Sequence, residues 1–384
     1  MNYIHLSPHF PPNYSLFSVR LREHGVNVLG LGDESFENLD TQLRSSLTDY
    51  YKVDDLHNYD QLMRGVGYFI NKYGKIDGID SHIEYWLETE AELRDDFNID
   101  GIRSDEFNYL SRKSSMKKIF LDCGLPVAQG KVIHSQKEAE EFISEVGYPV
   151  VVKPDKGVGA IDTFKLETRF DLENFFKFKP PGDFIFEEFI EGKIVSFDGI
   201  VDSDSRPIFF TSHQYSSGVM EIVNDDTNVY YFSFREIPED LINAGKKILK
   251  YIKLRKRFFH LEFFRTKEEK LIPLEINLRP PGGLTTDMFN YACDVDIYKE
   301  WATVITQNSL TYSFSRKYHV TFIGRKYNRI FMHSHDQILH RFSNKIVYHG
   351  EMPVAFSRAM GNYAYIVRSP ELEEVLDMTR FILE

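Results

Sequence analysis

Hydrophobic positions in the first 112 residues alternate between short apolar runs and longer segments with helical spacing. The apolar runs predict strands at 3–4, 26–31 and 75–80, and the helical segments lie at 16–24, 56–73 and 83–93. Gly25 and Gly74 each stand where a helix should end. Alternation of this kind is typical of a parallel sheet covered by helices. No G-x-G-x-x-G follows the first strand, so a dinucleotide site is not supported.

From residue 113 the chain mixes helices and strands in a less regular order. Helical spacing, with glycine and proline at several ends, predicts helices at 113–123, 135–146, 238–252, 297–305 and 370–383. Apolar and alternating runs predict strands at 149–153, 184–190, 194–201, 207–212, 258–264 and 271–279. We find no internal repeat, low-complexity tract or long linker in the sequence. This pattern indicates two or three folded domains.

Composition narrows the class of protein without naming its chemistry. The 384 residues include 42% hydrophobic and 27% charged side chains, which is ordinary for a globular protein with a sizeable core. The net charge of -12 argues against nucleic-acid binding, because phosphate contacts require clustered basic side chains. Cys123 and Cys293 fit no metal or redox spacing. No signal peptide or membrane-spanning run is visible, so we expect a cytoplasmic enzyme or binding protein.

One strand near residue 275 carries a row of polar side chains. Because side chains alternate faces along a strand, Glu275, Asn277 and Arg279 should project from the same side. The intervening positions are apolar and can seal a core: Leu274, Ile276 and Leu278. A hairpin through the polar connector 265–270 would bring Glu262 beside Glu275. Such hard oxygen donors suit Mg²⁺, and the alternative is a solvated strand face with a surface Glu/Arg pair.

Weaker signals precede that strand in the chain. Lys153 ends a Val-Val-Val run directly before a loop with glycines at 157 and 159, which can approach phosphate oxygens. It is not a Walker A loop, and an ordinary turn is the alternative for this stretch. Lys113 at a helix start could equally be a solvated lysine, and 186–190 an amphipathic strand.

Taken in order, these motifs resemble the ATP-grasp superfamily, in its carboxylate–amine (amino acid) ligase branch. The stretches that carry the resemblance are 113–126 for the entry helix, 148–159 for the lysine strand and phosphate loop, 186–192 for the hinge, and Glu262 with 274–279 for the metal strands. The resemblance implies a mixed fold, α/β plus α+β, with a Rossmann-like N-terminal domain. It implies domains at 1–112, 113–190 and 191–384, the second being the ATP-grasp lid.

The resemblance also implies residue roles. Those for ATP and its phosphates are Lys113, Lys153, Gly157, Val158, Gly159 and Ala160. The hinge residues that would meet the adenine are Glu187, Glu188, Phe189 and Ile190. Glu262, Glu275 and Asn277 would hold Mg²⁺, with Mn²⁺ as an alternative metal. Arg279 would stabilise the transferring phosphate as the catalytic residue. The family's ribose-binding acid is absent near Ile194, where Glu191 is a candidate replacement.

The implied reaction joins a small amino-acid-like carboxylate to an amine through an acylphosphate, releasing ADP and phosphate. Gly282 and Gly283 are candidates for binding a substrate carboxylate, and a tight turn is the equal alternative. Further pocket candidates are His213, Tyr215 and Met220, whereas His260 and the 333–340 histidines are interpreted as structural or surface residues. Competing hypotheses are a carbamoyl-phosphate- or carboxylase-type enzyme and a non-catalytic ATP-binding protein. We expect small-molecule substrates and no nucleic-acid or membrane partner, and a homodimer is one option for the assembly.

Overall fold

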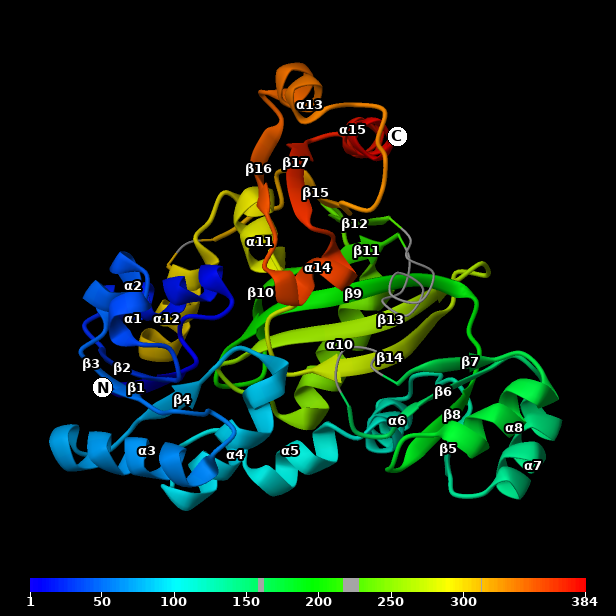
Figure 1. Ribbon diagram of the computed structural model, residues 1–384, viewed down its shortest axis with the longest axis horizontal. Coiled ribbons are helices and arrows are strands. Elements are labelled where there is room, and N and C mark those ends of the chain that lie inside the picture. The colour runs from blue at the N-terminus through cyan, green and yellow to red at the C-terminus, as the bar shows by residue number, and fades with distance from the viewer. Residues whose placement is uncertain (158–161, 217–227, 312) are drawn as a thin grey trace.

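The N-terminal part of the chain forms a parallel sheet with helices around it (Figure 1). This computed structural model describes residues 1–157, 162–216, 228–311 and 313–384. The strand order is β3-β2-β1-β4, for β1 (Asn2–Leu6), β2 (Asn27–Gly32), β3 (Asp49–Lys52) and β4 (Gly78–Asp80). The helices are α1 (Ser15–Glu23), α2 (Thr41–Ser46), α3 (Tyr59–Tyr73), α4 (Leu87–Asp96) and α5 (Ser104–Leu110). The predicted parallel sheet is confirmed, although β3, α2 and α5 were not anticipated.

The next part forms a small antiparallel sheet of order β5-β8-β6-β7. Its elements are α6 (Lys113–Asp122), β5 (Gly130–Ile133), α7 (Gln136–Val146), β6 (Val150–Pro154), β7 (Phe164–Leu166), α8 (Arg169–Phe178) and β8 (Phe184–Glu188). Phe142 of α7 and Phe175 of α8 share one buried cluster with Val152 and Phe186 of the sheet. Ser135 caps α7 by accepting from the Glu138 amide at 3.3 Å. Helices α7 and α8 therefore cover this sheet on the side away from the rest of the molecule (Figure 1).

A long antiparallel sheet forms the centre of the molecule. Its path is β14-β13-β9-β11-β12-β15-β17-β16, with β10 paired to β9. The strands are β9 (Gly192–Val201), β10 (Pro207–Thr211), β11 (His213–Tyr215), β12 (Val229–Ser233), β13 (Phe258–Thr266), β14 (Leu271–Asn277), β15 (His319–Arg325), β16 (Ile346–Glu351) and β17 (Tyr363–Ser369). The helices are α10 (Glu239–Ile252), α11 (Thr285–Cys293), α12 (Ile297–Gln307), α13 (His335–Phe342), α14 (Ser357–Met360) and α15 (Leu372–Leu383). The predicted domain boundaries after residues 112 and 190 stay predictions.

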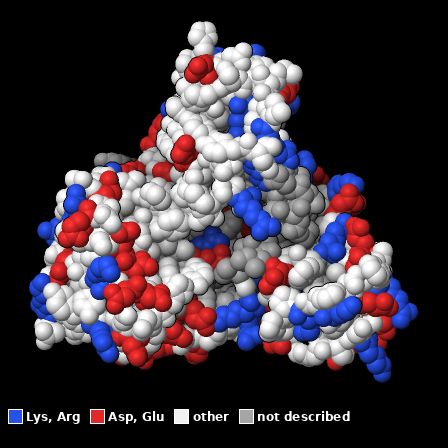
Figure 2. Space-filling model, viewed as in Figure 1, with Lys and Arg blue, Asp and Glu red and all other residues white. Residues whose placement is uncertain are grey.

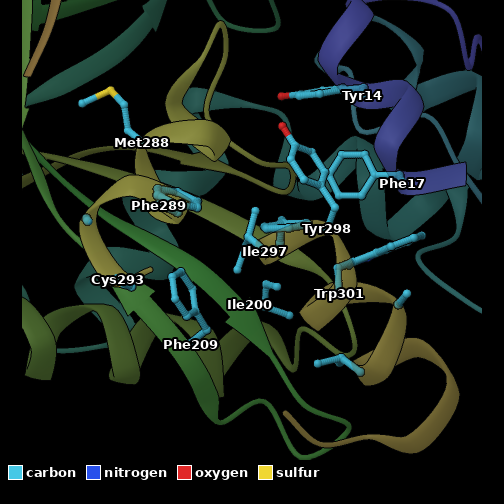
Figure 3. Close-up of a cluster of buried hydrophobic side chains, with 14 of the residues drawn as sticks. Tyr14, Phe17, Ile200, Phe209, Met288, Phe289, Cys293, Ile297, Tyr298 and Trp301 are labelled. Atoms are coloured by element: carbon cyan, nitrogen blue, oxygen red, sulfur yellow. The ribbon is translucent and has the colours of Figure 1, made fainter. Parts of the chain in front are cut away.

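An aromatic core joins the N-terminal part to the central sheet. Phe17 of α1 packs edge-on against Tyr298 and Trp301 of α12, with ring centroids 4.8 and 5.1 Å apart. Figure 3 shows these rings with Ile200 and Phe209 of the central sheet in the same cluster. Burial of such large apolar surfaces is the main favourable contribution at this contact. The two parts therefore share one hydrophobic core.

Four buried charged side chains lie beside that core. Arg257, at the start of β13, donates to Asp80 Oδ1 at 2.5 Å and to Glu90 Oε2 at 2.8 Å. Arg94 donates to the same two carboxylates at 3.1 and 2.8 Å. Arg257 Nε also donates to the Leu278 carbonyl at 2.6 Å, which ties this cluster to the end of β14. Among the described residues, no helix is both long and apolar enough to cross a membrane.

Candidate active site

The hairpin of β13 and β14 places acidic side chains side by side. In its antiparallel register Glu262 lies opposite Glu275, and His260 lies opposite Asn277. The connector closes with Thr266 N–H donating to the Lys270 carbonyl at 3.0 Å. The expected hairpin is therefore present, and Glu262, Glu275 and Asn277 all line one cavity.

A β-bulge changes the direction of one predicted core residue. The register shifts between Glu262 and Phe263, which pair with Glu275 and Pro273, so Leu274 has no opposite residue. Ile276 and Leu278 enter the buried core as expected, whereas Leu274 lines the cavity. The prediction that Leu274 seals the core is wrong, because strict alternation does not continue through a bulge.

The cavity lies between the small antiparallel sheet and the central sheet, with Glu84 of the N-terminal part in its wall, and has a volume of about 500 Å³. On the face shown in Figure 2 the surface is hollowed between the lobes, and charged side chains are visible inside. The predicted site residues that line it are Lys113, Lys153, Gly157, Glu187, Glu188, Phe189, Ile190, Glu262, Glu275, Asn277, Arg279 and Gly282. Val158, Gly159, Ala160 and Met220 lie outside the described residues. Sequence positions more than 150 residues apart thus meet in one space.

Glu187 pairs with two lysines at one end of the cavity. Its Oε1 lies 2.6 Å from Lys117 Nζ and its Oε2 lies 2.6 Å from Lys153 Nζ. Burial alone would raise the pKa of Glu187, but the two ammonium groups lower it to about 2. Lys117 was not predicted, although it follows Lys113 by four residues and therefore lies on the same face of α6. This spacing was the available sequence signal.

Lys113 connects the loop after β6 to strand β14. Its Nζ lies 3.3 Å from Glu275 Oε1 and donates to the Gly157 carbonyl at 3.3 Å. Burial alone would lower the pKa of Lys113, but Glu275 raises it above its ordinary value. The same contact helps to keep the pKa of Glu275 below its usual range, against the opposing effect of burial. Both groups are therefore held in their charged forms.

Arg279 is held by an acid from the N-terminal part. Its Nε donates to Glu84 Oε2 at 3.1 Å, its Nη2 also contacts that oxygen, and its Nη1 donates to the Pro280 carbonyl at 3.0 Å. Glu84 lies in the 3₁₀ turn η3 (Glu84–Trp86) and was not predicted. No local pattern marks it, because its role depends on a contact across 195 positions of sequence.

A buried acid and two histidines lie behind Glu262. Asp198 accepts from His260 Nδ1 at 2.5 Å and from His213 Nδ1 at 2.7 Å. His260 Nε2 lies 3.4 Å from Glu262 Oε1. Burial by itself lowers the pKa of His260, but Asp198 and Glu262 raise it to about 9. His260 therefore carries a charge next to the cavity, which its interpretation as an ordinary structural histidine did not anticipate.

One part of the cavity wall is formed by the turn after Arg279 and by α14. Gly283 has a φ of +66°, and a Cβ at this position would lie 2.2 Å from Met360 Cε. Its carbonyl accepts from Asn13 Nδ2 at 3.3 Å. Glycine is thus required at 283, because the backbone has a positive φ and because Met360 leaves no room for a Cβ. Tyr215 lines the same part of the cavity. The predicted surface histidines lie outside it: His333 is 3.6 Å from Glu384, and His335 forms a hydrogen bond with Tyr365.

The donors on the hairpin fit Mg²⁺. Two carboxylates and one amide oxygen line the cavity together, and Mg²⁺ is commonly held by one or two carboxylates plus substrate phosphates. Across the described ranges, no three His, Cys, Asp or Glu side chains gather into a complete metal cage.

Comparison with known proteins explains this arrangement. Residues 146–287 match the family model described as "ATP-grasp domain". The predicted resemblance to the ATP-grasp superfamily is confirmed for this segment. The chain is 24% identical over 258 residues to the L-arginine-specific L-amino acid ligase of Bacillus subtilis, a match spanning 65% of the chain and 62% of that ligase.

Solved structures share the fold of this chain over its whole length. The L-amino acid ligase from Bacillus licheniformis has a TM-score of 0.73 at 12% identity, covering 99% of this chain and 96% of that one. N5-carboxyaminoimidazole synthetase from Staphylococcus aureus has a TM-score of 0.73 at 15% identity, covering 99% and 97%. At these identities the likeness concerns the fold. The predicted fold class is confirmed over the whole chain.

Proposed function

We propose that the protein is an ATP-dependent ligase that joins a small amino-acid-like carboxylate to an amine through an acylphosphate. The observation that carries this proposal is that one cavity is lined both by lysines with Glu187 and by Glu262, Glu275 and Arg279. The names of the amino acid ligases that it resembles support the same reaction class. ADP and phosphate are the expected products.

ATP would lie along the lysine-lined part of the cavity. Lys113, Lys117 and Lys153 supply ammonium groups for the phosphates, and the loop from Gly157 to Ala160 is proposed to cover them. The hinge from Glu187 to Ile190 borders the space proposed for the adenine. Because Glu187 already accepts from two lysines, its first task is to orient those lysines rather than to contact the base.

The metal site would be formed by Glu262, Glu275 and Asn277. When bound there, Mg²⁺ supplies positive charge that offsets the charge developing on the transferred phosphate, and Mn²⁺ could serve in its place. His260 donates toward Glu262 and Lys113 toward Glu275, so each carboxylate is oriented from behind. Positioned charges of this kind need little reorganisation during the reaction.

Two displacement steps complete the reaction. First, a substrate carboxylate oxygen bonds to the γ-phosphorus while the bond from that phosphorus to ADP breaks. Next, the amine nitrogen bonds to the acyl carbon, phosphate leaves with its bonding electrons, and the amine loses a proton. Arg279 lies where it can stabilise the oxygen charge in both steps. Gly282 and Gly283 are proposed to hold the carboxylate substrate at the end formed by Tyr215 and Met360.

A trapping assay tests this function. The protein is incubated with Mg-ATP, one carboxylate at a time and hydroxylamine, which converts an acylphosphate into a hydroxamate. ADP together with hydroxamate is the expected result, and Asn277→Ala should remove both while the protein still melts cooperatively. AMP and pyrophosphate would overturn the acylphosphate route. Turnover with bicarbonate alone would indicate a carboxylase- or carbamoyl-phosphate-type enzyme, and no nucleotide turnover with any acid would indicate a binding protein.

A further inference from the structure

A second cavity lies beside the first, which we call the nucleotide cavity because ATP is proposed to bind there. It has a volume of about 620 Å³ and lies among α3, α4, α5 and α6, with Ile276 and Leu278 of the β14 region in its wall. The two cavities share four residues, namely Glu84, Gly157, Glu275 and Asn277. The second cavity therefore meets the first at the strand where the acyl and phosphoryl groups would react. None of the roles assigned so far uses this space.

Three glutamates at four-residue intervals give this cavity an acidic side. Glu84 holds Arg279, and Glu88 Oε1 lies 2.5 Å from Lys156 Nζ. Glu92 has no ion-pair or hydrogen-bond partner among the described residues, and partial burial, followed by the nearby Glu88, raises its pKa. Glu92 is thus the acid in this wall whose charge is not already neutralised by a contacting cation.

Aromatic rings line another part of the wall. Tyr59, Tyr85, Trp86 and Phe107 line the cavity, and Tyr85 is 56% exposed. The chain already places one ammonium group here: Lys156 Nζ lies 5.9 Å from the Phe107 ring centroid and 3.0 Å from Asn108 Oδ1. Aromatic faces next to carboxylates favour cations through both the ring quadrupole and the charge. The wall is therefore suited to a cation on an apolar stem.

We propose that this second cavity binds the amine substrate, and that it selects an amine carrying a second positive charge on an apolar stem. The inference rests on the proposed ligase function. ATP and the carboxylate occupy the first cavity in that reaction, so the nucleophile needs a separate approach to the acyl carbon. The border that the two cavities share at Glu84, Glu275 and Asn277 is where this approach would lie. The second charge of the amine would lie against Glu92, with the stem along Trp86 and Phe107.

Two matched amines test the selection directly. L-lysine and L-norleucine have the same carbon chain and differ in the terminal ammonium group. Binding to the full-length protein is followed by calorimetry and by the fluorescence of Trp86, since the other tryptophan, Trp301, is only 1% exposed. L-lysine should bind about tenfold more tightly than L-norleucine, the difference expected from one charge-assisted contact. The same ratio should appear in KM when each amine is the acceptor.

Variants separate this inference from the proposed function. Glu92→Gln should abolish the preference for L-lysine, whereas Glu106→Gln, on α5 and outside the cavity, should keep it. Hydroxamate formation should be unchanged in Glu92→Gln, because hydroxylamine is small and uncharged. Equal binding of the two amines, or an unchanged preference in Glu92→Gln, would overturn the inference even if hydroxamate forms. Failure to form hydroxamate with any acid overturns the ligase function instead, and the binding ratio still decides whether the cavity selects cations.

Discussion

Glu187 makes stability depend on pH through its two lysine partners. Its pKa in the folded protein is about 2, below the ordinary value of 4.5. A carboxyl with a lowered folded pKa stabilises the protein above its unfolded pKa, and this contribution is lost as pH falls toward the folded value. The stabilisation should be on the order of 3 kcal/mol at neutral pH and decline between about pH 4.5 and 2.

We therefore expect Glu187→Gln to lower the free energy of unfolding at pH 7 and to flatten its decline in acid. Denaturant unfolding at a series of pH values measures both effects. Glu191→Gln is the matched control, because Glu191 pairs with Lys267 on the surface, where both side chains are more than 70% exposed. An unchanged acid profile in Glu187→Gln would show that the lysine contacts do not hold this carboxyl ionised.

Arg279 should act on the reaction more than on nucleotide binding. Arg279→Lys keeps the positive charge but loses the planar group that contacts Glu84 and Pro280 together. We expect kcat to fall by about 10²–10³ while KM for ATP changes by less than about threefold, as for removal of an oxyanion donor. Steady-state kinetics measures both, with the exposed Arg22→Lys as control. A loss confined to ATP affinity would reassign Arg279 to nucleotide binding.

Local residue patterns explain which site residues were predictable. Glu262, Glu275 and Asn277 lie on two strands joined by a short turn, so alternation and the hairpin were enough to bring them together. Lys117 had a weaker signal in its four-residue spacing from Lys113. Glu84 had none, because its partner Arg279 comes from a distant segment. Contacts within one supersecondary unit can be predicted from sequence, and contacts between units depend on the packing of the whole chain.

At the scale of elements, the bulge in β14 leaves Ile276 in the hydrophobic core and Leu274 in the wall of the cavity. Ile276 is 3% exposed and belongs to the core, so Ile276→Ala should cost about 2–5 kcal/mol. Leu274 lines the nucleotide cavity, so Leu274→Ala should cost less than about 1.5 kcal/mol and should raise KM for a substrate. Chemical denaturation and steady-state kinetics on the two variants make the comparison. Equal loss of stability would mean that Leu274 is a core residue after all.

Helix α6 combines two tasks that sequence alone could not separate. Met116 and Ile119 pack into the core beside α10, while Lys113 and Lys117 face the nucleotide cavity. The helix itself was predictable from its spacing and from Gly124 at its end. Which of its lysines reach the cavity was not, because that depends on how the helix lies against β14.

At the scale of the molecule, the buried ions around Arg257 should couple the N-terminal part to the central sheet. Removing one member of a buried ion cluster leaves the others unpaired and costs about 3–5 kcal/mol. We expect Arg257→Ala to have this cost and to lower kcat, because Arg257 also holds the Leu278 carbonyl next to Arg279. Thermal unfolding and kinetics measure the two effects.

Arg255→Ala is the matched control for that variant. Arg255 is two residues away and mostly exposed, and its ion pair with the exposed Asp100 is long, at 3.8 Å. Its substitution should change stability by less than about 0.5 kcal/mol. If Arg257→Ala matched Arg255→Ala, the buried ions would not hold the two parts together.

The contact between Glu84 and Arg279 has a consequence for how this protein can vary. One partner belongs to the N-terminal part and the other follows β14 of the central sheet, so this side of the proposed reaction centre depends on two distant segments of the chain. In a chimera, the first 112 residues could be exchanged with those of a related protein. Arg279 would then contact a different side chain in place of Glu84, and the second cavity would have a different wall. The lysines and the strands β13 and β14 would stay the same. Substrate preference could then diverge through recombination of whole segments, without any change to the machinery that handles ATP.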